Sequence, residues 1–212
     1  MNAETFQRLQ GLRMENDAAR FNQQAMSPRF DALRTRHEDG TAPAAVSAFQ
    51  LFQTPPAVAA RLVELLAPSE GARILEPSAG LGRILDALEP RKPSEVVAVE
   101  ISPDCAGVLF KQDRPRLRIL QRDFLTIEPA AVGMVDFVAM NPPFHLRDDI
   151  RHITHALRFL KPGGRLAAVC MDTPHRSAAL RHLCDTWHPL PAGTFRTEGT
   201  NTACILLTIT KP

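Results

Sequence analysis

The feature that most constrains the fold is a regular alternation of short apolar runs with helical segments, which starts near residue 54 and continues to residue 210. The expected strands are 72–77, 95–102, 117–124, 134–141, 165–171 and 203–210, and the expected helices are 54–68, 81–90, 103–112, 147–164 and 176–187. Strands that alternate with helices form right-handed βαβ units, in which helices cover both faces of a mostly parallel sheet. The sequence therefore predicts an α/β fold with a doubly wound sheet.

The first 48 residues differ in composition from the rest of the chain. They are rich in Arg, Gln and Asn, and their apolar residues recur only at loose helical spacing. This pattern favours two polar helices separated near Pro28, followed by a linker at 39–45. We therefore expect an N-terminal helical extension at 1–48, which docks on the core or binds a partner, and the main domain at 49–212.

Composition limits the class of protein. The hydrophobic share of 44% and the charged share of 23% are typical of a globular chain. No apolar run approaches the roughly 20 residues of a membrane helix, and the polar start MNAETFQRLQ predicts no secretory signal. The four cysteines form no CxxC pair, which favours reduced thiols in a cytoplasmic protein. A net charge of +2 leaves a nucleic-acid partner open, provided that the basic surface is local.

A carboxylate and two glycines follow the first expected strand, at the edge of a doubly wound sheet where ligands bind. Glu76 ends that strand, and Gly80 and Gly82 come at the turn into the next helix. Glycines at such a turn allow a ligand to lie against bare backbone. Because a carboxylate repels phosphate, Glu76 favours a cationic ligand with an amino-acid tail.

Two further strands end in residues suited to a nucleoside. Glu100 can accept hydrogen bonds from both hydroxyls of a ribose, although alone it is also typical of a solvated strand end. Asp123 can accept a hydrogen from an adenine amino group, and the ring of Phe124 can cover the face of a base. The Asp-Phe dipeptide is common, so it supports a nucleoside site only in combination with the residues at the other strand ends.

The fourth expected strand ends in Asn141-Pro142-Pro143-Phe144, where both prolines lack an amide donor and have a fixed φ. The Asn141 carboxamide and the Pro142 carbonyl can accept the two N–H groups of a planar amine, and Phe144 can stack on its ring. Prolines fix both acceptors, so little orientation entropy remains to be lost in a transition state. The competing interpretation is a plain turn.

Upstream, Phe52 and Thr54 precede the first amphipathic helix and can line the same pocket. His152 and His155 are three residues apart on an expected helix, and His145 lies nearby. No fourth ligand at suitable spacing accompanies them, so we expect no metal site and no catalytic histidine. The arginines near the expected strand ends can form a phosphate-binding rim, for which the loop after Phe144 is the best candidate.

Together these motifs resemble the class I S-adenosylmethionine-dependent methyltransferases, and more closely the amino-methyltransferases with an Asn/Asp-Pro-Pro-Phe/Tyr/Trp motif. FQTP, LEPSAGLGRIL, VEIS, RDF and NPPF carry the resemblance, which spans residues 49–212. Their order is that of the gamma group of DNA adenine methyltransferases, and the C-terminal part is similar to methyltransferases of phages and mobile elements. The resemblance implies a Rossmann-like sheet of seven strands and S-adenosyl-L-methionine as the cofactor.

The same resemblance assigns the site residues. The cofactor-binding residues that it implies are Phe52, Thr54, Glu76, Pro77, Ser78, Ala79, Gly80, Gly82, Glu100, Ile101, Asp123, Phe124 and Asn141. The catalytic residues that it implies are Asn141, Pro142, Pro143 and Phe144, which clamp a flipped base while its amino nitrogen attacks the sulfonium methyl. Water then takes the proton of the product, so no general base is required.

The expected acceptor is the exocyclic amino group of adenine in DNA. The motif also occurs in ribosomal RNA guanine methyltransferases and in enzymes that methylate a protein glutamine, so RNA and protein acceptors stay open. A non-catalytic cofactor-binding subunit is the alternative from another class. The chain shows no target-recognition domain, so we expect specificity to come from residues 1–48, a second copy of the chain or a separate partner, and we expect no membrane association.

Overall fold

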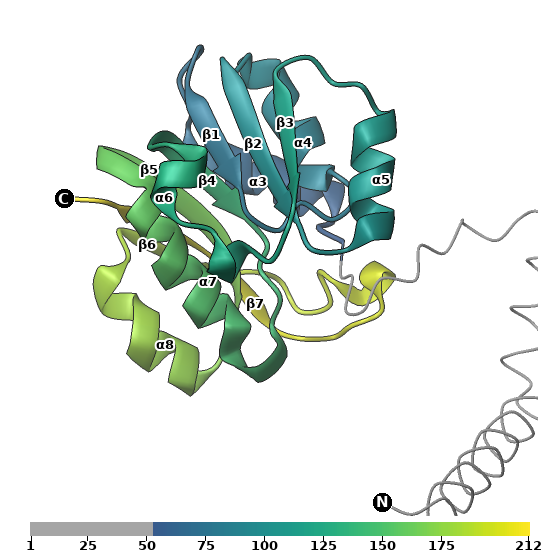
Figure 1. The fold of residues 1–212 in the computed structure, drawn as a ribbon. Helices are drawn as coiled ribbons and strands as arrows, with labels where there is room; N and C mark the ends of the chain where they lie inside the picture. The colour runs from purple at the N-terminus through teal and green to yellow at the C-terminus, as the bar shows by residue number, and fades with distance from the viewer. Residues whose placement is uncertain (1–52) are drawn as a thin grey trace, which may run out of the picture. The chain divides into compact units, whose positions relative to one another are not determined.

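The computed structural model describes residues 53–212, which form an α/β domain (Figure 1). Its strands are β1 Arg73–Glu76, β2 Glu95–Glu100, β3 Leu117–Gln121, β4 Val135–Met140, β5 Leu160–Met171, β6 Thr186–Pro189 and β7 Cys204–Thr210. Its α-helices are α3 Pro56–Leu66, α4 Arg83–Leu88, α5 Pro103–Lys111, α6 Pro129–Val132, α7 Asp148–Ala156 and α8 Pro174–Leu180. The expected extension at 1–48 and its boundary lie outside the described residues and stay predictions.

The seven strands form one sheet in the order β3-β2-β1-β4-β5-β7-β6. Strands β1 to β5 pair in parallel, whereas β7 is antiparallel to both β5 and β6. The predicted doubly wound, seven-stranded, mostly parallel sheet is therefore confirmed. The strand order reverses between β1 and β4, and ligands of doubly wound sheets bind at this point, beyond the carboxyl ends of the strands.

Alternate residues of each central strand pack against helices on opposite faces of the sheet. In β1, for example, Ile74 packs in one core cluster with residues of α3, α4 and α5. Leu75, the next residue, packs in a second cluster with residues of α6, α7 and α8. Because side chains of a strand alternate between faces, both faces need apolar residues. This explains why the central strands are almost continuously hydrophobic.

Helix α3 is the first element of the domain and shows how the sequence encodes its packing. Proline at its start needs no amide donor, and the helix ends where Ala67 adopts a φ of +50°. Its buried residues recur every three to four positions and include Val58, Leu62 and Leu66. The helix that the sequence predicts at 54–68 is therefore confirmed, with slightly shorter bounds.

Two predicted helices are longer than the observed ones. Helix α7 ends at Ala156, and β5 already begins at Leu160, because residues 160–164 extend the strand and Val135 pairs with Leu160. Helix α8 ends at Leu180, and the sequence missed the strand β6 that follows.

Strand β6 forms because its residues pair with β7. Trp187 lies opposite Leu207, and the hydroxyls of Thr186 and Thr208 are 2.8 Å apart. Four residues carry no clear period, so pairing with a distant strand outweighed the helical pattern. None of the helices in the described part of the chain is long and apolar enough to cross a membrane.

Candidate active site

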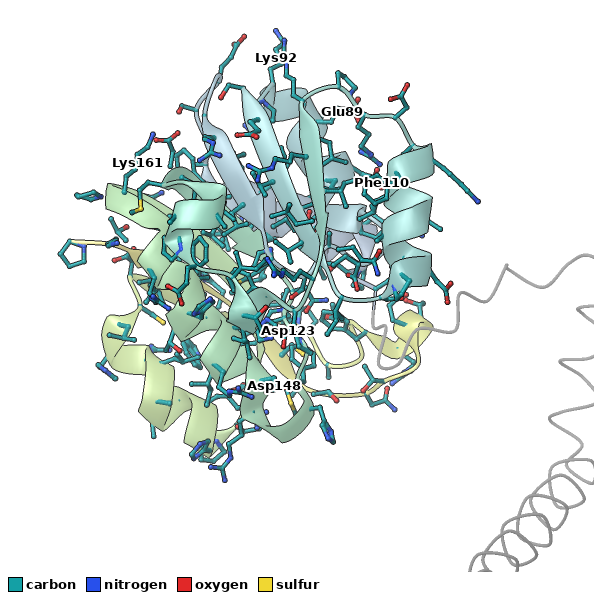
Figure 2. All side chains as sticks on the ribbon, in the orientation of Figure 1. Glu89, Lys92, Phe110, Asp123, Asp148 and Lys161 are labelled. Atoms are coloured by element: carbon teal, nitrogen blue, oxygen red, sulfur yellow. The ribbon has the colours of Figure 1, made fainter. Side chains whose placement is uncertain are left out.

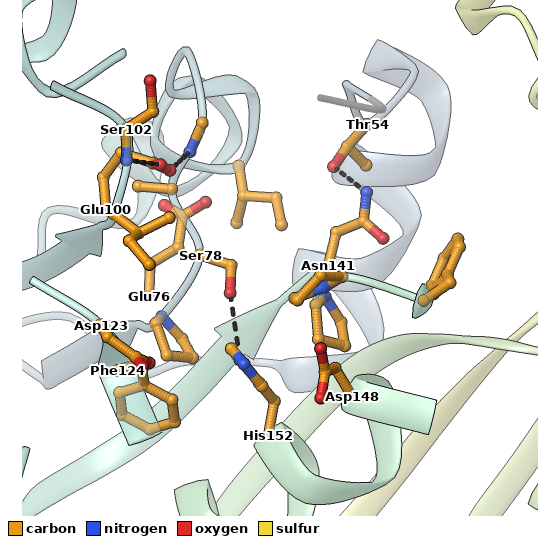
Figure 3. Close-up of a pocket in the computed structure, with 18 of the residues that line it drawn as sticks. Thr54, Glu76, Ser78, Glu100, Ser102, Asp123, Phe124, Asn141, Asp148 and His152 are labelled. Carbon is orange, nitrogen blue, oxygen red and sulfur yellow. Dashed lines mark hydrogen bonds between the residues drawn. The ribbon is translucent and has the colours of Figure 1, made fainter. Parts of the chain in front are cut away.

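A cleft with a volume of about 330 Å³ opens at the carboxyl ends of β1, β2 and β4 (Figure 3). This volume is in the range of small-molecule pockets. Among the residues that line the cleft are Thr54, Glu76, Pro77, Ser78, Ala79, Gly80, Glu100, Ile101, Asp123, Phe124, Asn141, Pro142, Pro143 and Phe144. The structure thus brings together the predicted site residues of the described chain, with the exception of Gly82. Phe52 lies outside the described residues.

Glu76 is the least solvated carboxylate of the cleft. Its side chain is 1% exposed, and within residues 53–212 its Oε2 accepts no hydrogen bond. Burial, and next the nearby charge of Glu100, raises the pKa of Glu76 well above its usual value. A buried carboxylate in this state is stabilised by a cation that brings its own N–H donors, so the wall at Glu76 fits an ammonium group.

Glu100 organises the turn that follows β1. Its Oε2 accepts a hydrogen bond from the Gly80 amide and its Oε1 accepts one from the Ser102 amide, both at 2.7 Å (Figure 3). Glu100 is 8% exposed, so it is not a solvated strand end. Each carboxylate oxygen has a second lone pair, which leaves Glu100 able to accept from ligand hydroxyls.

Asp123 and Phe124 differ in how far they face the cleft. The carboxylate of Asp123 accepts a hydrogen bond from the Leu125 amide at 2.9 Å. The ring of Phe124 is 2% exposed and packs edge-on against His155 and beside Phe159, with centroids 4.8 and 5.3 Å away. Phe124 is therefore mainly a core side chain that borders the cleft, which the sequence did not indicate.

Gly82 lies in the turn that leads from β1 into α4. It caps the N-terminus of α4 with a φ of +89°, which disfavours any side chain. A Cβ at this position would also lie 3.0 Å from Cδ2 of Leu109 on α5. A side chain here is therefore disfavoured by the turn and by helix packing. Gly82 is not among the residues that line the cleft, although its neighbours Leu81 and Arg83 are, and its predicted contact with the cofactor stays a prediction.

Asn141 lies at the end of β4, beyond the switch point of the sheet, and lines the cleft. Its Nδ2 donates a hydrogen bond to Oγ1 of Thr54 at 3.1 Å (Figure 3). This contact joins two segments that are 87 residues apart in the sequence. Because Thr54 is 5% exposed and held at the start of α3, the hydrogen bond fixes the orientation of the carboxamide.

The three residues after Asn141 form part of the wall of the cleft. Pro142 is buried, and Pro143 and Phe144 are partly exposed. The ring of Phe144 packs in part against the core cluster of α3 and α4 while it still borders the cleft. Its predicted stacking on a substrate ring stays a prediction.

His152 also borders the cleft, which the sequence analysis did not predict. Its side chain is 8% exposed and lines the cleft, with Nδ1 3.4 Å from Oγ of Ser78 (Figure 3). Burial lowers the pKa of His152, so the ring favours its neutral form. The available signal was its helical position: His152 shares a face of α7 with the buried Asp149 and Ala156.

The other two histidines have different surroundings. His155 Nε2 is 2.9 Å from the carbonyl oxygen of Ile127, and His145 is exposed. Within the described residues, no group of three or more His, Cys, Asp or Glu side chains could hold a metal ion.

Asp148 and several arginines also border the cleft. Asp148 pairs with Arg151 at 2.8 Å, and Arg122 is exposed beside Asp123. Asp123 and Asp148 lie at the end of the sheet opposite Glu89 and Lys92 (Figure 2). The cleft thus has buried carboxylates inside and exposed guanidinium groups near its mouth.

Comparison with known proteins supports a specific cofactor. Residues 75–168 match a family described as a methyltransferase domain, whereas no curated protein matches. Among solved structures, TrmN from Thermus thermophilus superposes with a TM-score of 0.60 at 23% identity, over 74% of this chain and 49% of TrmN. This chain therefore spans about half the length of TrmN.

Two other solved structures have the same fold. A modification subunit of a putative type I restriction enzyme from Vibrio vulnificus gives a TM-score of 0.62 at 18% identity, over 86% of this chain and 49% of that one. An RNA methyltransferase from Salinibacter ruber, in complex with S-adenosyl-L-homocysteine, gives a TM-score of 0.56 at 20% identity. The match covers 76% of this chain and 94% of that one.

The cleft fits the cofactor that the domain match implies. Buried Glu76 suits the ammonium group of a methionine moiety, Gly80 exposes backbone beside it, and Glu100 suits ribose hydroxyls. S-adenosyl-L-methionine is the cofactor. Residues 75–168 therefore match a methyltransferase domain, and the described part of the chain has the class I methyltransferase fold.

Proposed function

We propose that the protein methylates the exocyclic amino group of adenine in DNA. The observation that carries this proposal is the position of Asn141 at the switch point, with its carboxamide oriented by Thr54 and followed by two prolines. An amide oxygen on Asn141, followed in the chain by the carbonyl of a proline, suits the two hydrogens of an aromatic amine. These two acceptors suit a thiol, a carbon nucleophile or a hydroxyl less well, since none of these presents two N–H donors.

The residues of the loop would act on the acceptor in a simple way. When bound, S-adenosylmethionine supplies an activated methyl group to a nucleophilic nitrogen. The Asn141 oxygen and the Pro142 carbonyl oxygen each accept a hydrogen bond from one N–H group of the substrate amine. These hydrogen bonds draw the lone pair of the amine nitrogen out of conjugation with the ring. Phe144 covers the ring face. The methylated nitrogen loses a proton to water, so the chain needs no general base for this step.

Substitution of Asn141 tests the catalytic role. In Asn141→Ala we expect methylation to fall by about 100-fold or more, because the transition state loses an oriented acceptor. Binding of S-adenosyl-L-homocysteine, measured by calorimetry, should change little, since Glu76 and Glu100 are intact. The matched control is Asn201→Ala, which removes an exposed carboxamide before β7. Methylation near the wild-type rate in Asn141→Ala would refute the assignment.

A labelled-acceptor assay tests the substrate. The protein is incubated with tritiated cofactor and separate pools of DNA, ribosomal RNA and protein, and label is expected in DNA as N6-methyladenine. Guanine in RNA is the second candidate, because several structures with this fold are named RNA methyltransferases. Label confined to RNA, or to a protein glutamine, would overturn the DNA proposal.

Selection of the target site is a separate part of the proposal. Residues 53–212 form one α/β domain around the cleft. We propose that a second copy of the chain or a separate partner supplies sequence specificity. Turnover by the purified chain on non-specific DNA would be expected, and it would also exclude a role as a non-catalytic subunit.

A further inference from the structure

The loop after β4 is unusual because it has few backbone donors with which to hold its shape. Pro142 and Pro143 lack amide hydrogens, so neither can donate to a neighbouring strand or turn. At one end of the loop, Asn141 donates to Thr54. At the other end, the carbonyl oxygen of Phe144 accepts a hydrogen bond of 3.1 Å from Nη2 of Arg176.

Arg176 is itself held by a buried carboxylate. Its Nε lies 3.0 and 3.3 Å from the two carboxylate oxygens of Asp149, whose side chain is 0% exposed. The same carboxylate accepts from the Ile150 amide at 3.1 Å and from the Cys170 thiol at 3.5 Å. Four separate parts of the chain therefore meet here: α7, α8, the end of β5 and the loop after β4.

This ion pair differs from the other pairs of the described chain in its solvation. The side chains of Arg176 and Asp149 are 12% and 0% exposed, whereas those of Arg61 and Glu64 are 49% and 61% exposed. A buried pair gives little net stability, because desolvation of both charges offsets their attraction. Its geometry is nevertheless well defined, since the planar guanidinium has its donors in a fixed arrangement.

The geometry points to a positioning function for this pair, which rests on the proposed function of the loop. Arg176, held by Asp149, fixes the Phe144 carbonyl and thereby holds the segment that carries the Asn141 and Pro142 acceptors in its reactive conformation. Neither Arg176 nor Asp149 lines the cleft, so both are positioning residues and not catalytic ones. A displacement of about 1 Å at the reacting groups is enough to cost about 100-fold in rate.

The decisive variant is Arg176→Met, which keeps most of the side-chain volume and removes the donors. We expect amide hydrogens of residues 144–150 to exchange about 10-fold faster or more, which corresponds to the loss of one charge-assisted hydrogen bond. Exchange elsewhere in the sheet should stay near wild type. The matched control is Arg181→Met, which removes an arginine at the end of the same helix that lies over Trp187 and not on the loop.

Kinetics provide the second measurement. On DNA, kcat of Arg176→Met should fall by about 10- to 100-fold, while the affinity for S-adenosyl-L-homocysteine stays within about 2-fold of wild type. Arg176→Lys keeps the charge but not the planar fork, and it should recover only part of the rate. Unchanged local exchange, or a rate loss that merely follows a lower affinity for the cofactor product, would overturn the inference.

A neutral double variant covers the case in which Arg176→Met leaves Asp149 as an unpaired buried charge and the protein does not fold. Asp149→Asn with Arg176→Gln removes both charges, and Gln is too short to reach the Phe144 carbonyl. Faster exchange at 144–150 in this folded variant supports the inference, and wild-type exchange overturns it. If the wild-type protein methylates no DNA, the proposed function fails, whereas the exchange result still decides the role of Arg176.

Discussion

Glu76 and Glu100 are two carboxylates on one side of the cleft, and their environments give them different tasks. Glu100 accepts a backbone hydrogen bond on each oxygen, so both of its oxygens have a partner without a ligand. Glu76 is buried beside it with an oxygen that accepts no hydrogen bond from residues 53–212. An incoming ammonium group therefore gains most from Glu76, whereas Glu100 holds the turn open for it.

We expect Glu76→Gln to stabilise the free protein and weaken cofactor binding. The raised pKa of Glu76 means that the folded state holds a proton at pH values where the unfolded chain has lost it. The free energy of unfolding of the wild type therefore falls as the pH rises above 4.5, the ordinary pKa of a glutamate. Glu76→Gln should lack this decrease. Thermal unfolding between pH 5 and 8, at about one-unit steps, would show a gain of a few degrees at the upper end.

Binding separates this effect from a general change in stability. Loss of a charge-assisted hydrogen bond of about 1.5–3 kcal/mol corresponds to an affinity about 10- to 100-fold lower for S-adenosyl-L-homocysteine. The control is Glu95→Gln, because Glu95 pairs with Arg73 on the same sheet but far from the cleft. Glu76→Gln with wild-type affinity would show that the ammonium group is bound elsewhere.

At the scale of elements, the bare backbone of Gly82 at the start of α4 leaves room for Leu109 of α5. We expect Gly82→Ala to lower the free energy of unfolding by about 2–4 kcal/mol, from the left-handed φ and the contact with Leu109 together. Gly71→Ala is the matched control: its φ is +77° and no atom lies within 4 Å of the added Cβ, so it carries only the backbone cost of about 1–2 kcal/mol.

Cofactor affinity distinguishes the packing role of Gly82 from the ligand contact that the sequence suggested. Because Gly82 does not line the cleft, folded Gly82→Ala should bind S-adenosyl-L-homocysteine about as well as wild type. A selective loss of affinity, with little loss of stability in urea, would instead support the sequence-based assignment.

Helix α7 contacts the turn after β1 through His152 and Ser78, and the burial of His152 there makes stability depend on pH. The charged and titratable groups around His152 are Asp148, Asp123, Arg151 and His155, and burial outweighs them to lower its pKa. The folded state then binds fewer protons than the unfolded chain, so stability falls as pH drops below 6.5.

Below pH 6.5, His152 is expected to cost the wild type up to about 1.4 kcal/mol of its free energy of unfolding for each pH unit, until the ring is protonated in the folded state. We expect His152→Gln to lack this decrease. Urea unfolding at a series of pH values from 7.5 to about 5 measures the difference. His182→Gln is the control, because the side chain of His182 is exposed. Equal pH dependence in both variants would contradict a buried neutral ring at position 152.

For the whole molecule, a net charge of +2 means that nucleic-acid binding depends on where the positive charges lie. Arg122 is exposed at the mouth of the cleft, and Arg118 is exposed near the opposite end of β3. If DNA lies across the cleft, Arg122→Gln should weaken binding and reduce the slope of log affinity against log salt by about 1. Arg118→Gln should leave the slope unchanged, and equal slopes in both variants would place DNA elsewhere.

Much of the site could be predicted because the chain folds by a simple rule. Parallel strands bring the residues that follow them to one edge, so Glu76, Glu100, Asp123 and Asn141 had to lie near one another once the alternation was recognised. Strand β6 and His152 could not be predicted in this way. The strand depends on pairing with β7, and the histidine depends on which face of α7 is turned toward the cleft.

The sequence by itself determined the doubly wound sheet and the strand ends that form the cleft, because hydrophobic periodicity and turn residues are local properties of the chain. Only the tertiary structure decided that Thr54 orients Asn141, that Arg176 holds Phe144 and that Gly82 serves helix packing. These contacts join residues that are distant in sequence, or fill space between helices. Their energies depend on distance and burial, which no local pattern encodes.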